Sequence, residues 1–88
     1  MQYKCNIMKN RICVIGIAVK DRTNAAEKIN QILSDFGEIV VGRLGIPYRE
    51  KKISVISVIV DGTTDQIGAL TGKLGQVKNI KVKSVILI

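Results

Sequence analysis

Apolar and polar positions along the 88-residue chain fall into four strand-like and two helix-like segments. Residues 12–19 and 53–60 are rich in β-branched side chains and apolar on both faces, which is typical of central strands. Residues 39–46 and 80–88 carry glycines or lysines, which is typical of edge strands. Because proline has no N–H to donate to a strand ladder, we expect Pro47 to end the second strand.

Two segments between the strands have the three- and four-residue spacing of amphipathic helices. The first begins at Thr23 or Asn24, and Gly37 follows it, where a left-handed residue commonly ends a helix. Thr63 and Gln66 have the spacing of a capping box and predict the start of the second helix.

The predicted element order is βαββαβ, and the two halves of the chain repeat the same succession of strand, turn, helix and strand. This order predicts the α+β class and a ferredoxin-like βαββαβ sandwich. Such a fold has a four-stranded antiparallel sheet with two helices on one face. We expect the domain to span residues 11–88, after a polar N-terminal tail at residues 1–10.

The sheet face that the helices leave uncovered should be polar in a monomer. Here the predicted central strands are apolar on both sides. The third strand, for example, has Ile53, Val55 and Ile59 on one face and Ile56, Val58 and Val60 on the other. Monomers rarely expose such a patch. We therefore expect a homo-oligomer, a dimer or a tetramer, formed by sheet-to-sheet packing or by edge pairing of strands.

The composition argues against several classes of function. The chain has no histidine, which rules out Ser-His and Cys-His catalytic pairs, and we expect no enzyme activity. Cys5 and Cys13 are too few for a four-ligand zinc site, and we expect neither metal nor cofactor. We expect Asp21 and Asp61 to be turn or helix-start residues.

No apolar run reaches the ~18–20 residues of a membrane span, so we expect a cytoplasmic protein without a membrane partner.

The most unusual stretch is residues 42–49, which combines two glycines with two arginines and a tyrosine. These side chains suit an anion or a planar group, and the formal net charge of +7 also favours acidic partners. The alternative is a bulged edge strand followed by a rigid turn with solvated arginines. The predicted ligand-binding residues are Arg43, Tyr48, Arg49, Asp21 and Arg22.

Two glycines, Gly68 and Gly72, lie four residues apart within the predicted second helix. Their spacing does not match a phosphate-binding loop. They leave a smooth strip along the helix, and we expect close packing there against a neighbour, within the chain or across an interface.

The motifs at residues 14–22, 42–49, 60–65 and 70–75 resemble those of the iron-only hydrogenase system regulators. The resemblance spans about residues 11–85, and the Gly-Arg-x-Gly-Ile-Pro-Tyr block is its specific part. It implies an ACT-like fold, similar to the sensing domain of the nickel-responsive repressor, and a regulatory role in the iron-only hydrogenase system. The chain lacks the glycine of the first ACT loop and the histidines of the nickel sensor. Amino-acid binding and nickel binding of those types are therefore not expected.

Two main functions remain open, beside a third hypothesis of a small enzyme subunit that would hold a metal or cofactor between the turns at Asp21 and Asp61. The leading hypothesis is a stand-alone regulatory module that forms oligomers and binds a small effector or a protein partner. The alternative is a transcriptional regulator that binds DNA directly through its basic edges. Against the alternative, the sequence has no helix-turn-helix signal and no stacking aromatics on its central strands. The basic residues concerned are Lys78, Lys81 and Lys83 near one edge, and Arg43, Arg49, Lys51 and Lys52 near another.

Overall fold

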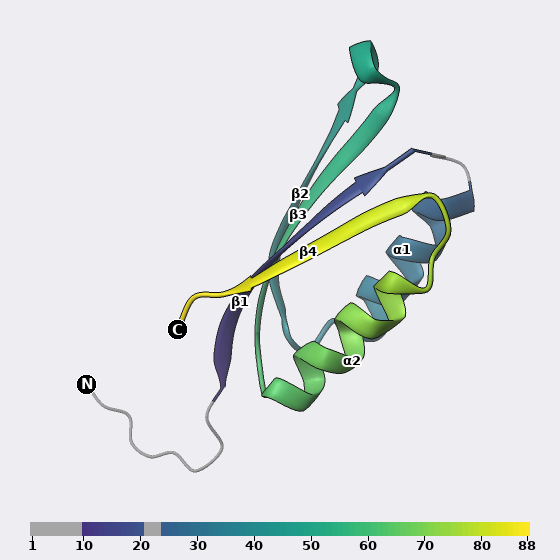
Figure 1. Cartoon of the computed structure of the whole chain (residues 1–88). Helices are drawn as coiled ribbons and strands as arrows, with labels where there is room; N and C mark the ends of the chain where they lie inside the picture. Colours follow the sequence, from purple (N-terminus) through teal and green to yellow (C-terminus); the bar gives the residue numbers. More distant parts are fainter. Residues whose placement is uncertain (1–9, 21–23) are drawn as a thin grey trace.

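The structure is a computed structural model that describes residues 10–20 and 24–88. None of the helices in these two ranges is long and apolar enough to cross a membrane. The elements, shown in Figure 1, are β1 (Arg11–Val19), α1 (Asn24–Asp35), β2 (Val40–Tyr48), the short 3-10 helix η1 (Arg49–Lys51), β3 (Ile53–Gly62), α2 (Thr64–Gly75) and β4 (Ile80–Ile86).

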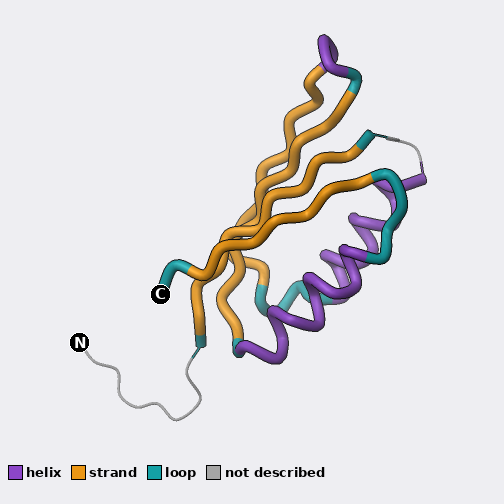
Figure 2. Tube along the Cα trace, viewed as in Figure 1, coloured by secondary structure: helices purple, strands orange, loops and turns teal. Residues whose placement is uncertain are grey.

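The four strands form one antiparallel sheet in the order β2-β3-β1-β4. The two most apolar strands, β1 and β3, lie at the centre and pair along the whole length of β1. Both helices lie against the same face of this sheet (Figure 2). The predicted ferredoxin-like βαββαβ fold is confirmed, and so is the division into central and edge strands.

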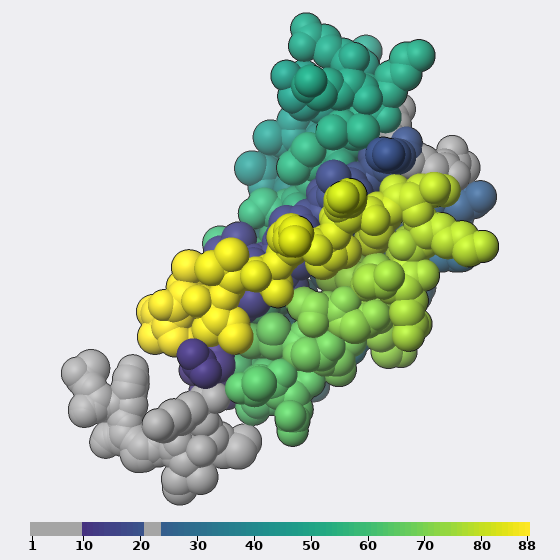
Figure 3. All heavy atoms as spheres, in the orientation of Figure 1, coloured from purple at the N-terminus to yellow at the C-terminus, as the bar shows by residue number. Residues whose placement is uncertain are grey.

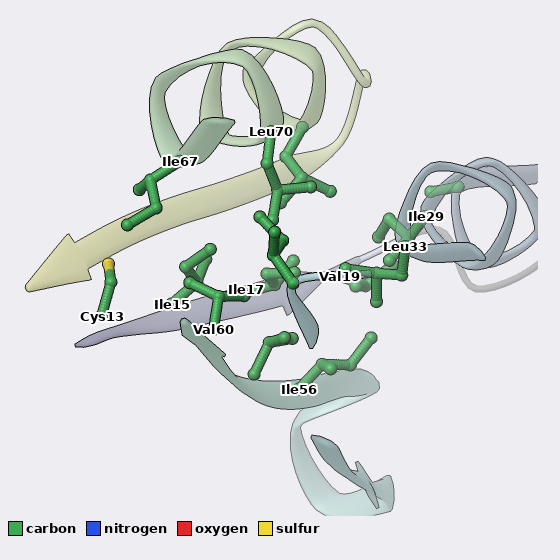
Figure 4. Packing of buried hydrophobic residues seen from close by; sticks show 14 residues of the cluster. Cys13, Ile15, Ile17, Val19, Ile29, Leu33, Ile56, Val60, Ile67 and Leu70 are labelled. Carbon is green, nitrogen blue, oxygen red and sulfur yellow. The ribbon is translucent and has the colours of Figure 1, made fainter. Parts of the chain in front are cut away.

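The hydrophobic core lies between the sheet and the two helices, and Figure 4 shows its side chains meeting there. Full burial of a large aliphatic side chain stabilises a fold by roughly 1.5–3 kcal/mol. This layer therefore holds both helices on the sheet. Its buried members are Cys13, Ile15, Ile17 and Val19 of β1, Ile56, Val58 and Val60 of β3, Ala25, Ile29 and Leu33 of α1, Ile67, Leu70 and Leu74 of α2, and Ile39.

The strand ends differ from those that the sequence pattern predicts. The expectation that β2 stops before Pro47 is wrong, because Pro47 lies within the ladder opposite Ser54. An edge strand pairs on one side only, so it can accommodate a residue without an N–H. β3 continues through Asp61 to Gly62 because β1 pairs with both. Asp61 is therefore a strand residue and not the expected turn residue, and β4 stops at Ile86, short of its predicted end.

The start of α2 matches the sequence prediction, whereas the end of α1 does not. The Thr63 hydroxyl accepts a bond from the Gln66 amide at 3.1 Å, and Gln66 Oε1 accepts one from the Thr63 amide at 2.8 Å. The expected left-handed conformation of Gly37 is wrong, because no described glycine has a positive φ. A Cβ on Gly37 would lie 3.2 Å from the Ser34 carbonyl oxygen, so a close backbone approach favours glycine there.

The glycines of α2 do not pack against another part of the described chain. Gly68 and Gly72 are exposed, and a Cβ at either would meet nothing within 4 Å. The expected packing of this strip against a neighbour within the described chain is therefore wrong. Packing of the strip across an interface with another chain stays a prediction. Gly62 is different, since a Cβ there would lie 2.9 Å from Gln66 Oε1 and 3.0 Å from Ile39 Cγ2.

Alanine at Gly62 and alanine at Gly72 should shift stability in opposite directions. Gly72→Ala should raise the free energy of unfolding by about 0.5–1 kcal/mol, because alanine favours an exposed helix position. Gly62→Ala should lower it by about 1–3 kcal/mol, because the new methyl group must displace Ile39 or break the capping box. Urea unfolding followed by circular dichroism measures both. A stabilised Gly62→Ala variant would contradict the packing described for this position.

Candidate functional site

The face of the sheet opposite the helices is not covered by any other part of residues 10–20 and 24–88 (Figures 1 and 2). We call this surface the open face. Six of its large apolar side chains expose between 42% and 61% of their surface. The prediction that the sheet is apolar on both sides is confirmed by this exposure. These side chains are Leu44, Ile46 and Tyr48 of β2, Val55 and Ile59 of β3, and Val85 of β4.

The middle of the open face has small side chains, and two lysines lie toward one edge. Gly16 and Ala18 of β1 lie on this face at the centre of the sheet. Lys83 and Lys81 of β4 lie opposite them and are exposed. Figure 3 shows β4 in yellow along the surface beside α2. The open face is therefore apolar toward β2 and β3 and cationic toward β4.

The β2–β3 hairpin extends beyond the helices and carries the three described residues of the predicted ligand site (Figure 1). Arg43 lies opposite Val58, so it shares the helix-covered face of the sheet. Its Nη2 donates to Oδ1 of Asn30 on α1 at 2.8 Å. Tyr48 lies on the open face, and Arg49 is exposed in η1 at the tip.

The alternation of strand side chains separates Arg43 from Tyr48. They are five residues apart, roughly 16 Å along the strand, and belong to opposite faces. The structure therefore brings Tyr48 and Arg49 together but leaves Arg43 apart from them. Asp21 and Arg22 lie outside the described residues. The sequence did not identify Asn30 as a partner, because nothing in the spacing of the first helix links it to a strand that follows.

A β-bulge interrupts β2 between Val40 and Gly42, where the pairing with β3 shifts register. Gly42 is half-buried and Gly45 is exposed, and a Cβ on Gly42 would meet nothing within 4 Å. The alternative of a bulged edge strand is thus correct for the backbone of this stretch. It explains the irregular pattern without requiring a ligand.

Cys13 is fully buried in the core beside Ile15, and its thiol is free (Figure 4). Within residues 10–20 and 24–88 no group of three or more His, Cys, Asp or Glu residues is placed to hold a metal ion. Cys5 lies outside the described residues. In the described chain, Cys13 is therefore a packing residue.

The sequence matches the TM1266-like family over residues 11–84. That family is described as an iron-only hydrogenase system regulator, a role that the description gives as provisional. The match confirms the resemblance that the motifs at residues 42–49 and 60–65 indicated. No curated protein matches the chain.

Solved structures with the same fold include one from the same family. The uncharacterized protein TM1266 from Thermotoga maritima is 38% identical, with a TM-score of 0.87 over 91% of this chain and 100% of that one. The ACT domain of GTP pyrophosphokinase from Chlorobium tepidum is 18% identical, with a TM-score of 0.74 over 88% of this chain and 100% of that one. A formyltetrahydrofolate deformylase from Pseudomonas putida is 9% identical, with a TM-score of 0.60 over 84% of this chain and 28% of that one. The last two show the ACT-like fold alone.

The bond between Arg43 and Asn30 should couple the two residues weakly. Both are exposed, so we expect an interaction energy of about 0.5 kcal/mol in a double-mutant cycle of Arg43→Ala and Asn30→Ala. Urea unfolding of the two single variants and the double variant measures it. Strict additivity of the two single effects would show that the bond does not hold the hairpin to α1.

Proposed function

Because this chain belongs to the TM1266-like family of iron-only hydrogenase system regulators, we propose that it is a non-catalytic regulatory module that works as a homo-oligomer. The observation that carries the proposal is the apolar open face of an ACT-like sheet. A second copy that packs sheet to sheet on this face would remove the apolar side chains of both copies from water.

The size of the open face bears on how two copies associate. Its six large side chains are about half exposed, so burying the rest of each should contribute roughly 1 kcal/mol. Two copies together would gain about 12 kcal/mol, against an association cost of ~4–15 kcal/mol. The gain and the cost are similar, so association on this surface requires most of both faces to be covered. Symmetric packing of one sheet on the other achieves that coverage.

The edges of the sheet are less suited to association than its face. β2 is bent by the bulge before Gly42 and contains Pro47, which cannot donate to an added strand. β4 carries Lys81 and Lys83, and lysines on an edge strand disfavour pairing with another chain. Sheet-to-sheet packing is therefore the mode we propose, in preference to edge pairing.

The hairpin tip is the proposed contact for a small anionic effector or a protein partner. Tyr48 belongs to the open face and Arg49 follows it in η1, so the tip borders the surface on which a second copy would lie. A ligand at the tip could therefore alter how the copies associate. Arg43 already bonds to Asn30 from the other face, which favours a structural role for it.

Direct DNA binding competes with this proposal for one surface. Lys81 and Lys83 lie on the open face, so DNA held by them would cover the area assigned to a second copy. A duplex bound through these lysines would lose affinity steeply with added salt. Absence of duplex binding at low salt would remove this alternative.

A charge on the open face should separate the copies. Ile46→Glu places a carboxylate in the apolar surface, so this variant should sediment as a folded monomer while the natural chain sediments as a dimer or tetramer. Sedimentation velocity at micromolar concentration measures the difference. Ser34→Glu is the matched control, because Ser34 is exposed on α1, on the other side of the sheet, and its charge should leave assembly unchanged. A natural chain that stays monomeric would overturn the proposed assembly.

Removing the arginine at the hairpin tip should reduce the response to anionic metabolites. In a thermal-shift screen, a compound that stabilises the natural chain should stabilise Arg49→Ala less, because one cation is lost at the tip. Arg43→Ala should respond like the natural chain, since Arg43 lies on the opposite face. An equal response of Arg49→Ala and the natural chain would exclude the tip as the effector site.

A further inference from the structure

A hollow lies between the two helices, on the side of the molecule away from the open face. Its volume is ≈ 460 Å³, within the ~300–1,000 Å³ of small-molecule sites. α1 contributes Lys28, Gln31 and Ile32 to its lining, and the end of α2 with the turn after it contributes Lys73, Gln76, Val77 and Lys78. All of these side chains come from one copy of the chain.

Positive charge gathers around this hollow without a compensating acid in its described lining. Three ammonium groups belong to it, those of Lys28, Lys73 and Lys78, and none of the described lining residues is Asp or Glu. Like charges brought together on a surface repel each other and raise the local affinity for anions. The hollow is therefore suited to a negatively charged ligand.

The helix dipoles account for only part of this arrangement. Lys73 lies in the last turn of α2, where a cation is favoured by the dipole of the helix. Lys28 lies in the N-terminal half of α1, where the dipole gives a cation no benefit. Its place beside the cations of α2 is therefore not explained by the stability of its own helix.

The hollow also offers an apolar surface between its charges. Ile32 and Val77 are half-buried and pack against the core, so they form a fixed apolar part of the lining. Gln31 donates from Nε2 to Oδ1 of Asp35 at 2.9 Å, which restrains its side chain. An uncharged group of a ligand can lie on the two aliphatic residues while its anionic group meets the lysines.

We propose that this hollow binds a small phosphorylated metabolite with two or more negative charges and an apolar or planar part, of the class of nucleoside diphosphates. Phosphate oxygens accept bonds from the ammonium groups, and the planar part lies against Ile32 and Val77. The site is a hollow of limited size between two helices, which suits a small ligand better than the long backbone of a nucleic acid. It is independent of the assembly proposed above, because it lies within one copy.

Isothermal titration calorimetry of the full chain with ADP tests this site. We expect saturable binding, weakened about fivefold by Lys28→Gln and by Lys73→Gln, since each removes one cation and keeps much of the side-chain length. Lys83→Gln is the matched control, because it removes the same charge from β4 on the open face, away from the helices, and should leave the affinity unchanged. Inorganic pyrophosphate should compete with ADP, whereas uncharged adenosine should bind more weakly than ADP.

Several outcomes would overturn the site. One is the absence of saturable binding of both ADP and pyrophosphate. Another is an equal loss of affinity in Lys83→Gln and Lys28→Gln. Duplex DNA that binds more tightly than ADP and depends equally on Lys28 and Lys73 would also contradict the proposal. The hollow would then be a nucleic-acid site and not a small-molecule site. The monomeric Ile46→Glu variant should bind ADP as the natural chain does. A result that contradicts the proposed assembly therefore does not contradict the ligand site in the hollow. A result that contradicts the ligand site likewise does not contradict the assembly.

Discussion

Burial of aliphatic side chains against the two central strands is the interaction on which this molecule depends. The strands β1 and β3 carry Ile and Val on both sides, and the chain has no tryptophan and a single phenylalanine to enlarge its core. A chain of this size can place only one layer of helices on the sheet. One side of the sheet is covered by α1 and α2, and the other side keeps its apolar surface in water. The same composition that stabilises the domain therefore leaves a surface to be covered.

The two sides of the sheet consequently take different parts in the proposed function. The open face has an apolar area toward β2 and β3 and lysines toward β4, which suits contact with a second copy. Among the described residues, no large apolar side chain of α1 or α2 is exposed, and the two helices bring cations around one hollow. A regulator built in this way can assemble through one layer and bind a ligand through the other. The two layers share one hydrophobic core, in which Ile29 and Leu70 pack between the helices and the sheet.

Family membership and structural likeness support different parts of the proposed function. Membership of the TM1266-like family supports a regulatory role, and the likeness to an ACT domain at 18% identity adds the fold alone. The residues that bind an effector have to be argued from this chain itself. The hairpin tip and the helix hollow are two candidates that differ in mechanism, since only the tip borders the open face.

The sequence by itself determined the fold, because the relevant signals are local. Apolar runs, helical spacing and the pair formed by Thr63 and Gln66 each reflect neighbours in the chain, so the element order and the central position of β1 and β3 could be inferred. The ends of the strands were harder to predict from the sequence. Pro47 and Asp61 stay within strands because a neighbouring strand pairs with them, and the local pattern carries no information on that neighbour.

The candidate sites were decided by the tertiary structure. Arg43 and Tyr48 are close in sequence, yet the pleat of β2 places them on opposite faces, and the partner of Arg43 is Asn30 on a helix. Lys28 and Lys73 are far apart in sequence and carry no motif, and they line one hollow only because α1 and α2 lie on the same side of the sheet. The spacing of side chains along a strand or a helix follows from the sequence. Which elements meet across space depends on how the whole core packs.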